Sequence, residues 1–272
     1  ALSRRFPDKR GLAISLHGTG GSIGEVIGPV ATAALLTVMM WREVLQASLF
    51  PAVLSGFALW AMMRSVPGDV PGSSSSREYF ASLANLLKKR AIIVLVLITA
   101  MRSVGMAAIM TFLPVYLRED LAYSPYGAAS LMSLAQLVGI GTQPAMGHLS
   151  DTHGRKRILV PAMLILGLSI LALLIVEPGW KLITTVSVMG AFMYSLHTIF
   201  IAAAMDVAEG EVQATVVSLI YGASFLGTVS PIFAGLIVDN FGMQAAFLYA
   251  GVAVILATAV LVSLRLPQTT SS

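Results

Sequence analysis

The stretch "GHLSDTHGRKRIL", residues 147–159, holds one aspartate, two histidines and three consecutive cations. Apolar sequence flanks it on both sides, "SLMSLAQLVGIGTQPAM" before it and "LVPAMLILGLSILALLIV" from residue 159 on. Charge avoids the hydrocarbon interior of a membrane, so a short charged connection between two long apolar segments is typical of a turn at a membrane surface. The stretch therefore predicts that both flanking segments cross a lipid bilayer.

The composition of the whole chain supports a membrane protein. Of its 272 residues, 57% are hydrophobic and only 11% are charged, and the mean hydropathy is +0.85. A soluble domain carries about 25% charged residues, so the bilayer is the expected solvent. The chain contains no cysteine, which excludes disulfides and cysteine-based metal sites. Its net charge of +4 indicates nucleic acid only if the cations gather on one domain, and they do not.

Membrane-crossing helices need about 20 mostly apolar residues. Eight segments meet this requirement, which predicts an all-α integral membrane protein with eight transmembrane helices: 11–38, 42–64, 91–117, 124–147, 157–176, 180–205, 211–238 and 243–265.

One connection, residues 65–90, is long. Its first half is rich in proline, glycine and serine, which is typical of a flexible linker. In its second half Phe80, Leu83 and Leu87 form an apolar stripe that is followed by three cations, which predicts a short amphipathic helix on the membrane surface. The alternative is a disordered tether.

The cations predict the orientation. An even number of spans puts both termini on one side, and that side holds 13 of the 17 Lys and Arg residues, whereas three lie on the other side and Arg102 lies within a span. By the positive-inside rule both termini are cytoplasmic, in a cell (inner or plasma) membrane.

Two segments repeat a pattern of Ser-Leu, spaced small residues and proline: "RGLAISLHGTGGSIGEVIGP" (10–29) and "QATVVSLIYGASFLGTVSP" (213–231). Such an internal echo indicates two related bundles. We therefore expect a shortened first bundle of two helices in residues 1–64, a cytoplasmic linker at 65–90, a six-helix bundle at 91–266 and a tail at 267–272.

Residues 147–159 resemble the signature loop of the major facilitator superfamily of transporters. The match is carried by residues spaced as Gly-x-Leu-small-Asp-x-x-Gly-Arg-basic-basic, while Thr152 and His153 depart from the usual basic and aromatic residues. "GEVIGP" (24–29) resembles the Gly-Pro motif of that family's fifth helix. The resemblance covers helices five to twelve of a twelve-helix transporter, so we expect the chain to correspond to an N-terminally truncated member.

The signature residues suggest a cytoplasmic gate. Gly147 and Gly154 permit a tight reversal, and Asp151 is placed to face the positive N-terminal end of segment 11–38, because the family pairs these two regions. Arg155 could pair with Asp206 or Glu209. The gating residues expected from this reading are Gly147, Asp151, Gly154, Arg155, Lys156, Arg157, Asp206 and Glu209. The alternative is that the cations only set the topology.

Polar groups at membrane depth are costly and are usually functional. Arg102 lies near the middle of its span and is expected to bind solute or a partner carboxylate. The alternative is a structural ion pair or a cation that caps backbone carbonyls. Glu25 lies beside a predicted helix-packing face, and it is a candidate carrier of a coupling proton or a partner in a hydrogen bond between helices. The predicted packing motif consists of Gly20, Gly24, Gly28 and Pro29.

Weaker candidates for contact with solute share polar faces of the spans. They are His17, Tyr194 and His197, and the pair Gln136 and Gln143. Each of these side chains could equally form a hydrogen bond between helices. The 14 methionines are interpreted as lipid-facing residues or core filler.

These features favour secondary or facilitated transport of a small solute by alternating access, as a permease or an efflux pump. No P-loop appears, which argues against direct use of ATP, and no enzyme constellation or metal-binding pattern is present in the sequence. We expect no cofactor, with a coupling proton left open, and the lipid bilayer and a solute as partners. The oligomeric state is left open, although members of the family that the chain resembles are typically monomeric. The alternative is a non-transporting scaffold or sensor with the same fold.

Overall fold

A computed structural model describes residues 38–64, 76–208 and 213–264, together with twelve single residues between Leu12 and Leu35. Regular structure in the long described ranges is helical. The elements are α3 (Trp41–Met63), α4 (Ser76–Lys88), α5 (Arg90–Glu119), α6 (Pro125–His153), α7 (Arg155–Ala172), α8 (Trp180–Val207), α9 (Gln213–Phe225), η2 (Leu226–Val229), α10 (Ser230–Phe241) and α11 (Gln244–Ser263). The chain is thus an all-α protein, as expected.

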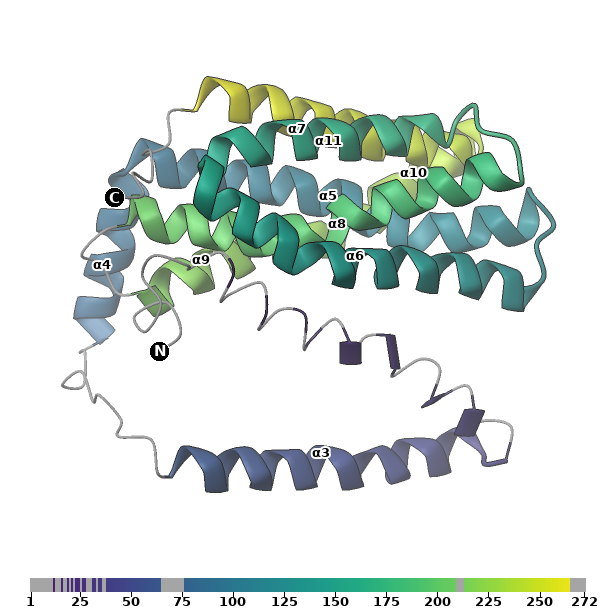
Figure 1. Cartoon of the computed structure of the whole chain (residues 1–272), viewed down its shortest axis with the longest axis horizontal. Helices are drawn as coiled ribbons and strands as arrows, with labels where there is room; N and C mark the ends of the chain where they lie inside the picture. Colours follow the sequence, from purple (N-terminus) through teal and green to yellow (C-terminus); the bar gives the residue numbers. More distant parts are fainter. Residues whose placement is uncertain are drawn as a thin grey trace.

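The helices from α5 to α11 form one elongated bundle, and α4 lies across one end of it (Figure 1). Helix α3 runs along the lower edge of this view, apart from the bundle. Its large apolar side chains are exposed, with Phe50 83% and Phe57 66% accessible. A helix that is apolar all round and uncovered is compatible with lipid or with other helices as its surroundings.

Five segments in the described ranges are long and apolar enough to cross a membrane: Trp41–Met62, Arg90–Glu119, Trp180–Val207, Thr215–Phe241 and Gln244–Ser263. Each matches one of the eight expected spans. The expected spans 124–147 and 157–176 form α6 and α7, which run beside the others but are more polar, since α6 carries two glutamines and α7 begins with three cations. Most of the expected span 11–38 lies outside the described residues.

The expected span 211–238 is not one continuous helix. It consists of α9, the 3-10 turn η2 and α10. At this turn Gly227 approaches α5 so closely that an added Cβ would lie 2.5 Å from the carbonyl oxygen of Ser103. Only glycine permits this approach, which brings the broken helix against the part of α5 that carries Arg102.

Helices α6 and α8 form the most extensive helix pair in the bundle, and they meet through small residues. An added Cβ at Gly139 would lie 2.8 Å from Tyr194 Cβ, and one at Gly190 would lie 2.2 Å from the Ala135 carbonyl oxygen. Small residues let helix backbones approach in membranes, where packing replaces the hydrophobic effect as the force between helices.

The charged stretch is more helical than the sequence suggested. Helix α6 continues to His153, and α7 begins at Arg155, so only Gly154 connects them. Gly154 has φ +92°, which favours glycine, and it makes the reversal. The prediction was wrong for Gly147, which is buried inside α6 rather than placed in a turn.

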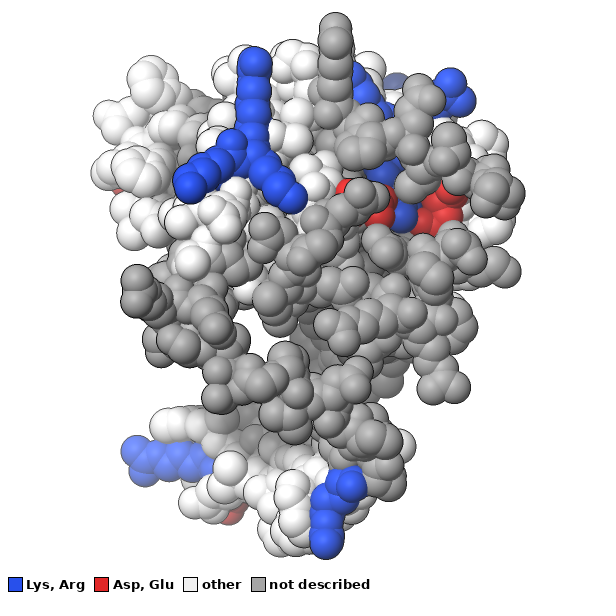
Figure 2. Space-filling model, turned by 90° about the vertical axis from the view of Figure 1, so that its left-hand side faces the viewer, with Lys and Arg blue, Asp and Glu red and all other residues white. Residues whose placement is uncertain are grey.

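The second half of the long connection forms the expected helix, α4. The predicted apolar stripe needs a correction, because Leu86 is fully buried while Leu87 is 43% exposed; Leu83 is half-buried. Leu86 therefore attaches α4 to the bundle. Figure 2 views this end of the molecule and shows Lys and Arg side chains over it. The Lys and Arg residues described at this end include Lys88, Lys89, Arg90, Arg155, Lys156 and Arg157 in the bundle and α4, and Arg64 after α3.

Candidate solute cavity and cytoplasmic gate

Arg102 lies near the middle of α5 and is only 2% exposed. Its Nη1 donates to the Met193 carbonyl oxygen at 3.3 Å and approaches Met106 Sδ at 3.7 Å. Its Nη2 lies 3.4 Å from His197 Nδ1, and its Cζ lies 6.0 Å from the centre of the Phe200 ring. In the described part of the chain, no carboxylate forms a salt bridge with Arg102.

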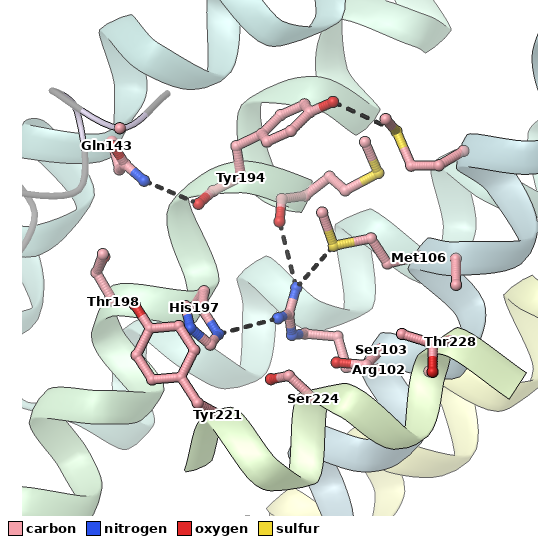
Figure 3. Close-up of a pocket in the computed structure, with 15 residues that line it drawn as sticks. Arg102, Ser103, Met106, Gln143, Tyr194, His197, Thr198, Tyr221, Ser224 and Thr228 are labelled. Carbon is pink, nitrogen blue, oxygen red and sulfur yellow. Dashed lines mark hydrogen bonds between the residues drawn. The ribbon is translucent and has the colours of Figure 1, made fainter. Parts of the chain in front are cut away.

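His197, on α8, connects Arg102 with the broken helix. Its ring packs edge-on against Tyr221 of α9, with ring centres 4.9 Å apart. Because a guanidinium only donates hydrogen bonds, Nδ1 of His197 is the acceptor in the contact with Arg102. In a neutral imidazole the proton then resides on Nε2. Figure 3 shows His197 between the Arg102 guanidinium and the Tyr221 ring.

These residues border a cavity of about 570 Å³ within the bundle (Figure 3). This volume is typical of sites for small organic molecules. Its wall comes from α5, α6, α8, α9 and η2, with Gly21 from the N-terminal segment. The residues that line it are Gly21, Arg102, Ser103, Met106, Ala107, Met110, Gln143, Met193, Tyr194, His197, Thr198, Tyr221, Ser224, Gly227 and Thr228.

The Gln143 side chain is a second polar group in the cavity wall, and it forms hydrogen bonds to two different segments. Gln143 of α6 donates from Nε2 to the Tyr194 carbonyl oxygen at 3.1 Å, and its Oε1 accepts from Thr19 Oγ1 at 3.1 Å. The Tyr194 hydroxyl donates to Met110 Sδ at 3.4 Å. Gln143 thus connects the bundle of α5 to α11 with the N-terminal segment, at the same cavity that Arg102 borders.

Four predicted candidates, Arg102, Gln143, Tyr194 and His197, line this one cavity. Gln136 is half-buried on α6 and is not among the lining residues. His17 and Glu25 lie outside the described residues. So do Gly20, Gly28 and Pro29 of the predicted packing motif, and an added Cβ at Gly24 would meet no described atom within 4 Å. The close packing predicted for Gly24 is therefore not found among the described residues.

Several cavity residues were missed from the sequence. Met106, Met110 and Met193 border the cavity, a position that the reading of methionine as lipid-facing or core filler did not include. Met193 also belongs to the buried core, as that reading allows. Arg102, Met106 and Met110 repeat at i, i+4 and i+8, which is one face of a helix. Tyr221, Ser224 and Thr228 repeat at i, i+3 and i+7, and this polar stripe in an apolar span was a readable signal.

At the end of the bundle near α4, the charged stretch forms a buried network. Arg155 is 4% exposed; its Nε donates to Asp206 Oδ2 at 2.8 Å, and its Nη1 donates to Ser150 Oγ at 2.8 Å and to Asp151 Oδ1. Asp151 Oδ2 also accepts from the Leu12 backbone N–H at 2.9 Å. The network joins α6, α7 and α8 to the beginning of the N-terminal segment.

The neighbouring gate candidates differ in their contacts. Lys156 Nζ donates to the carbonyl oxygens of Val262 and Leu264, both at 2.6 Å, so it caps the C-terminal end of α11. Arg157 is exposed. Glu209, the alternative partner of Arg155, lies outside the described residues.

The helical bundle, its membrane-length apolar segments and its mainly apolar internal cavity, which one buried arginine borders, define a multi-pass membrane protein with a cavity of the size that small molecules occupy. The sequence profile of the Major Facilitator Superfamily matches residues 1–228 and 95–272, and the chain belongs to this family. It is a family of transporters rather than enzymes, and its members generally need no cofactor. In the described part of the chain, no group of three or more His, Asp or Glu side chains could hold a metal ion.

Three bacterial proteins named "Multidrug resistance protein MdtG" are similar to this chain. The Enterobacter lignolyticus protein is 25% identical over 270 residues, which cover 96% of this chain and 63% of that protein. The Salmonella typhimurium protein is 26% identical, with 88% and 60% covered. The Klebsiella pneumoniae protein is 26% identical, with 97% and 65% covered. The chain thus spans 60 to 65% of the length of these relatives.

Proposed function

We propose that this chain takes part in secondary or facilitated transport of a small solute by alternating access, with the cavity around Arg102 as the solute site. The observation that carries the proposal is the position of this arginine. A charged side chain in the middle of a long apolar helix costs at least about 2.5–3.5 kcal/mol on membrane-insertion scales, so it is retained only where it contributes to function or structure. Here it borders a cavity large enough for an organic molecule.

The buried network around Arg155 acts as a cytoplasmic gate in this proposal. Asp151 holds the first turn of the N-terminal segment through the Leu12 amide, while Arg155 holds the end of α8 through Asp206. These contacts tie the N-terminal segment to the bundle of α5 to α11 at one end of the molecule. Breaking them would allow that end to open while the opposite end closes, which is the motion that alternating access requires.

The orientation and the driving force are part of the same proposal. Both termini and the gate lie on the cytoplasmic side, because this side carries the excess of Lys and Arg. The solute moves down its own gradient or with a coupling proton, for which Glu25 is the candidate carrier. The division into two bundles at residues 65–90 belongs to this account, and the protein acts in the inner or plasma membrane.

The relatives named for multidrug resistance favour drug-like solutes and export. A wall that combines thioethers, aromatic rings and a few polar groups suits such molecules, because methionine adapts to irregular shapes. A non-transporting scaffold with the same fold has no need of a buried cation beside a cavity, so this alternative is disfavoured.

The direct test measures uptake and efflux of a panel of radiolabelled or fluorescent drugs in sealed vesicles that contain the protein, with and without a pH gradient. We expect saturable flux that vanishes in Arg102→Gln and persists in Arg118→Gln. Arg118 is the matched control because it lies on the same helix and is exposed. Flux equal to that of empty vesicles for every compound, from correctly inserted protein, would contradict the proposal.

A further inference from the structure

In the described structure, only neutral groups contact the charged side chain of Arg102. Its partners are a backbone carbonyl, a thioether and an imidazole nitrogen. A guanidinium remains charged in proteins, so the cavity carries a positive charge. A buried charge is normally paired with an opposite charge, and among the described side chains no carboxylate supplies one here.

One donor of this guanidinium is also unused. Arg102 Nε is buried, and it has no hydrogen-bond partner among the described atoms. Buried donors without partners are rare in proteins, because each costs about 1–3 kcal/mol. The contacts of Nη1 and Nη2 with Met193, Met106 and His197 hold the group in place, so the guanidinium is pre-oriented at the cavity wall. A ligand carrying a negative charge would supply the missing compensation.

The rest of the cavity wall indicates which kind of molecule should carry the negative charge of the ligand. Met106, Met110 and Met193 provide polarizable apolar surface, and the rings of Tyr194 and Tyr221 provide aromatic surface. Among the described residues of this lining there is one guanidinium and no lysine. The composition therefore fits a single anionic group on an apolar or aromatic body, rather than a sugar or an inorganic dianion.

We infer that the cavity selects amphipathic organic anions, a carboxylate or a sulfonate joined to an aromatic or aliphatic body, with Arg102 as the residue that recognises the charge. The inference rests on the proposed function in taking this cavity as the solute site, and it names the class of solute. His197 positions the guanidinium through Nδ1, and it lines the same cavity.

The test uses three probes that share one ring system and differ in charge: 2-naphthylacetate, 2-naphthylethanol and 2-naphthylethylammonium. Binding to the purified protein in detergent is measured by isothermal titration, with protein-free micelles as the blank. We expect 2-naphthylacetate to bind about 10- to 100-fold more tightly than the neutral probe, the range for a hydrogen bond to a charged group. The cationic probe should bind most weakly.

Two variants of Arg102 and one control variant assign the preference to Arg102. Arg102→Gln should weaken binding of 2-naphthylacetate to the level of the neutral probe and leave binding of the neutral probe within about threefold, since the apolar wall is intact. Arg118→Gln should behave as the unaltered protein. Arg102→Lys, which keeps the charge but loses the planar donor array, should retain part of the preference. Size-exclusion profiles and melting temperatures identify any variant that has failed to fold.

The outcomes separate the inference from the proposed function. Tighter binding of the cationic probe, an anion preference that survives Arg102→Gln in a folded protein, or no binding of any probe to a cavity of this size would overturn the inference. Flux of each probe into vesicles is then measured independently. Arg102-dependent binding of the anion without any flux would reject the proposed transport and retain the inference. Flux of the probes without a preference for the anion would retain the proposed transport and reject the inference.

Discussion

Arg155 Nε lies 2.8 Å from Asp206 Oδ2, a contact that fastens the first residue of α7 to the last turn of α8. Both side chains are largely buried, with 4% and 11% exposed. Arg155 also contacts Asp151, so one guanidinium compensates two carboxylates from two helices. The charged turn is therefore part of the packed structure, in addition to any role of its cations in topology.

Replacing Arg155 by glutamine should destabilise the protein strongly. Two largely buried carboxylates would lose their cation, and breaking a buried ion pair from one side costs about 3–5 kcal/mol. Thermal unfolding in detergent should show a clear fall in melting temperature. Arg157→Gln, at an exposed cation two residues away, should change it little. Equal melting temperatures for the two variants would mean that the network contributes nothing to stability.

Asp151→Asn should impair transport more than it impairs insertion. The amide keeps the shape of the side chain but loses the charge that interacts with Arg155 and with the Leu12 amide. We expect the initial flux to fall about tenfold or more, the effect of losing roughly 1.4 kcal/mol of coupling between the gate and the solute site. Asp120→Asn, at an exposed position after α5, is the control. Normal flux from the inserted Asp151 variant would reduce the network to a structural role.

Two glycines of α6 provide a matched test of the packing between helices. Gly139→Ala would place a Cβ 2.8 Å from Tyr194 and 2.9 Å from the Gly190 carbonyl oxygen, whereas Gly141→Ala would meet nothing within 4 Å. Overpacking costs about 1–3 kcal/mol. The Gly139 variant should therefore melt at a lower temperature, and the Gly141 variant should be unchanged or slightly more stable, because alanine favours helix. Similar melting temperatures would contradict the close α6–α8 contact.

Single cysteines can test the orientation without background, because the chain contains no cysteine. His153→Cys lies at the gate end, and Glu177→Cys lies in the connection at the opposite end of α7; both positions are exposed. A membrane-impermeant maleimide added to intact cells should label the Glu177→Cys variant, and it should label the His153→Cys variant only after lysis. The reverse pattern would invert the topology, and labelling of both variants in intact cells would mean that α7 does not cross the membrane.

Much of the fold was predictable because it depends on the period and length of apolar segments. The five membrane-length segments, the helix α4 and the charged reversal at Gly154 follow from patterns within one segment. The expected span 211–238 is interrupted at η2, where Pro231 stands in the first turn of α10 and Gly227 contacts the α5 backbone. The proline is a local breaker that the sequence shows, whereas the contact of Gly227 with α5 is not readable from one segment.

Residues of the candidate site were predictable only where a charged or polar side chain lies in an otherwise apolar helix. Arg102 and His197 are conspicuous in apolar helices, but Met106 and Met193 are not, since the same side chain serves in a core, in lipid or at a cavity wall. Asp206 could be proposed as a partner of Arg155 because both were expected at one membrane surface. Gln136 was chosen for sharing a helix face with Gln143, and i, i+7 spacing does not determine which residue reaches a cavity.

The central claim is that the cavity beside Arg102 opens to each side of the membrane in turn. Ser224 lines this cavity, so the variant Ser224→Cys reports access to it. Membrane-impermeant thiol reagents are applied from either side of oriented vesicles, and labelling rates are compared with those of the same variant in an Asp151→Asn background. The account predicts labelling from both sides, with the cytoplasmic rate raised by the gate substitution. Labelling of the introduced cysteine from one side only, at a rate that the gate substitution leaves unchanged, would contradict it.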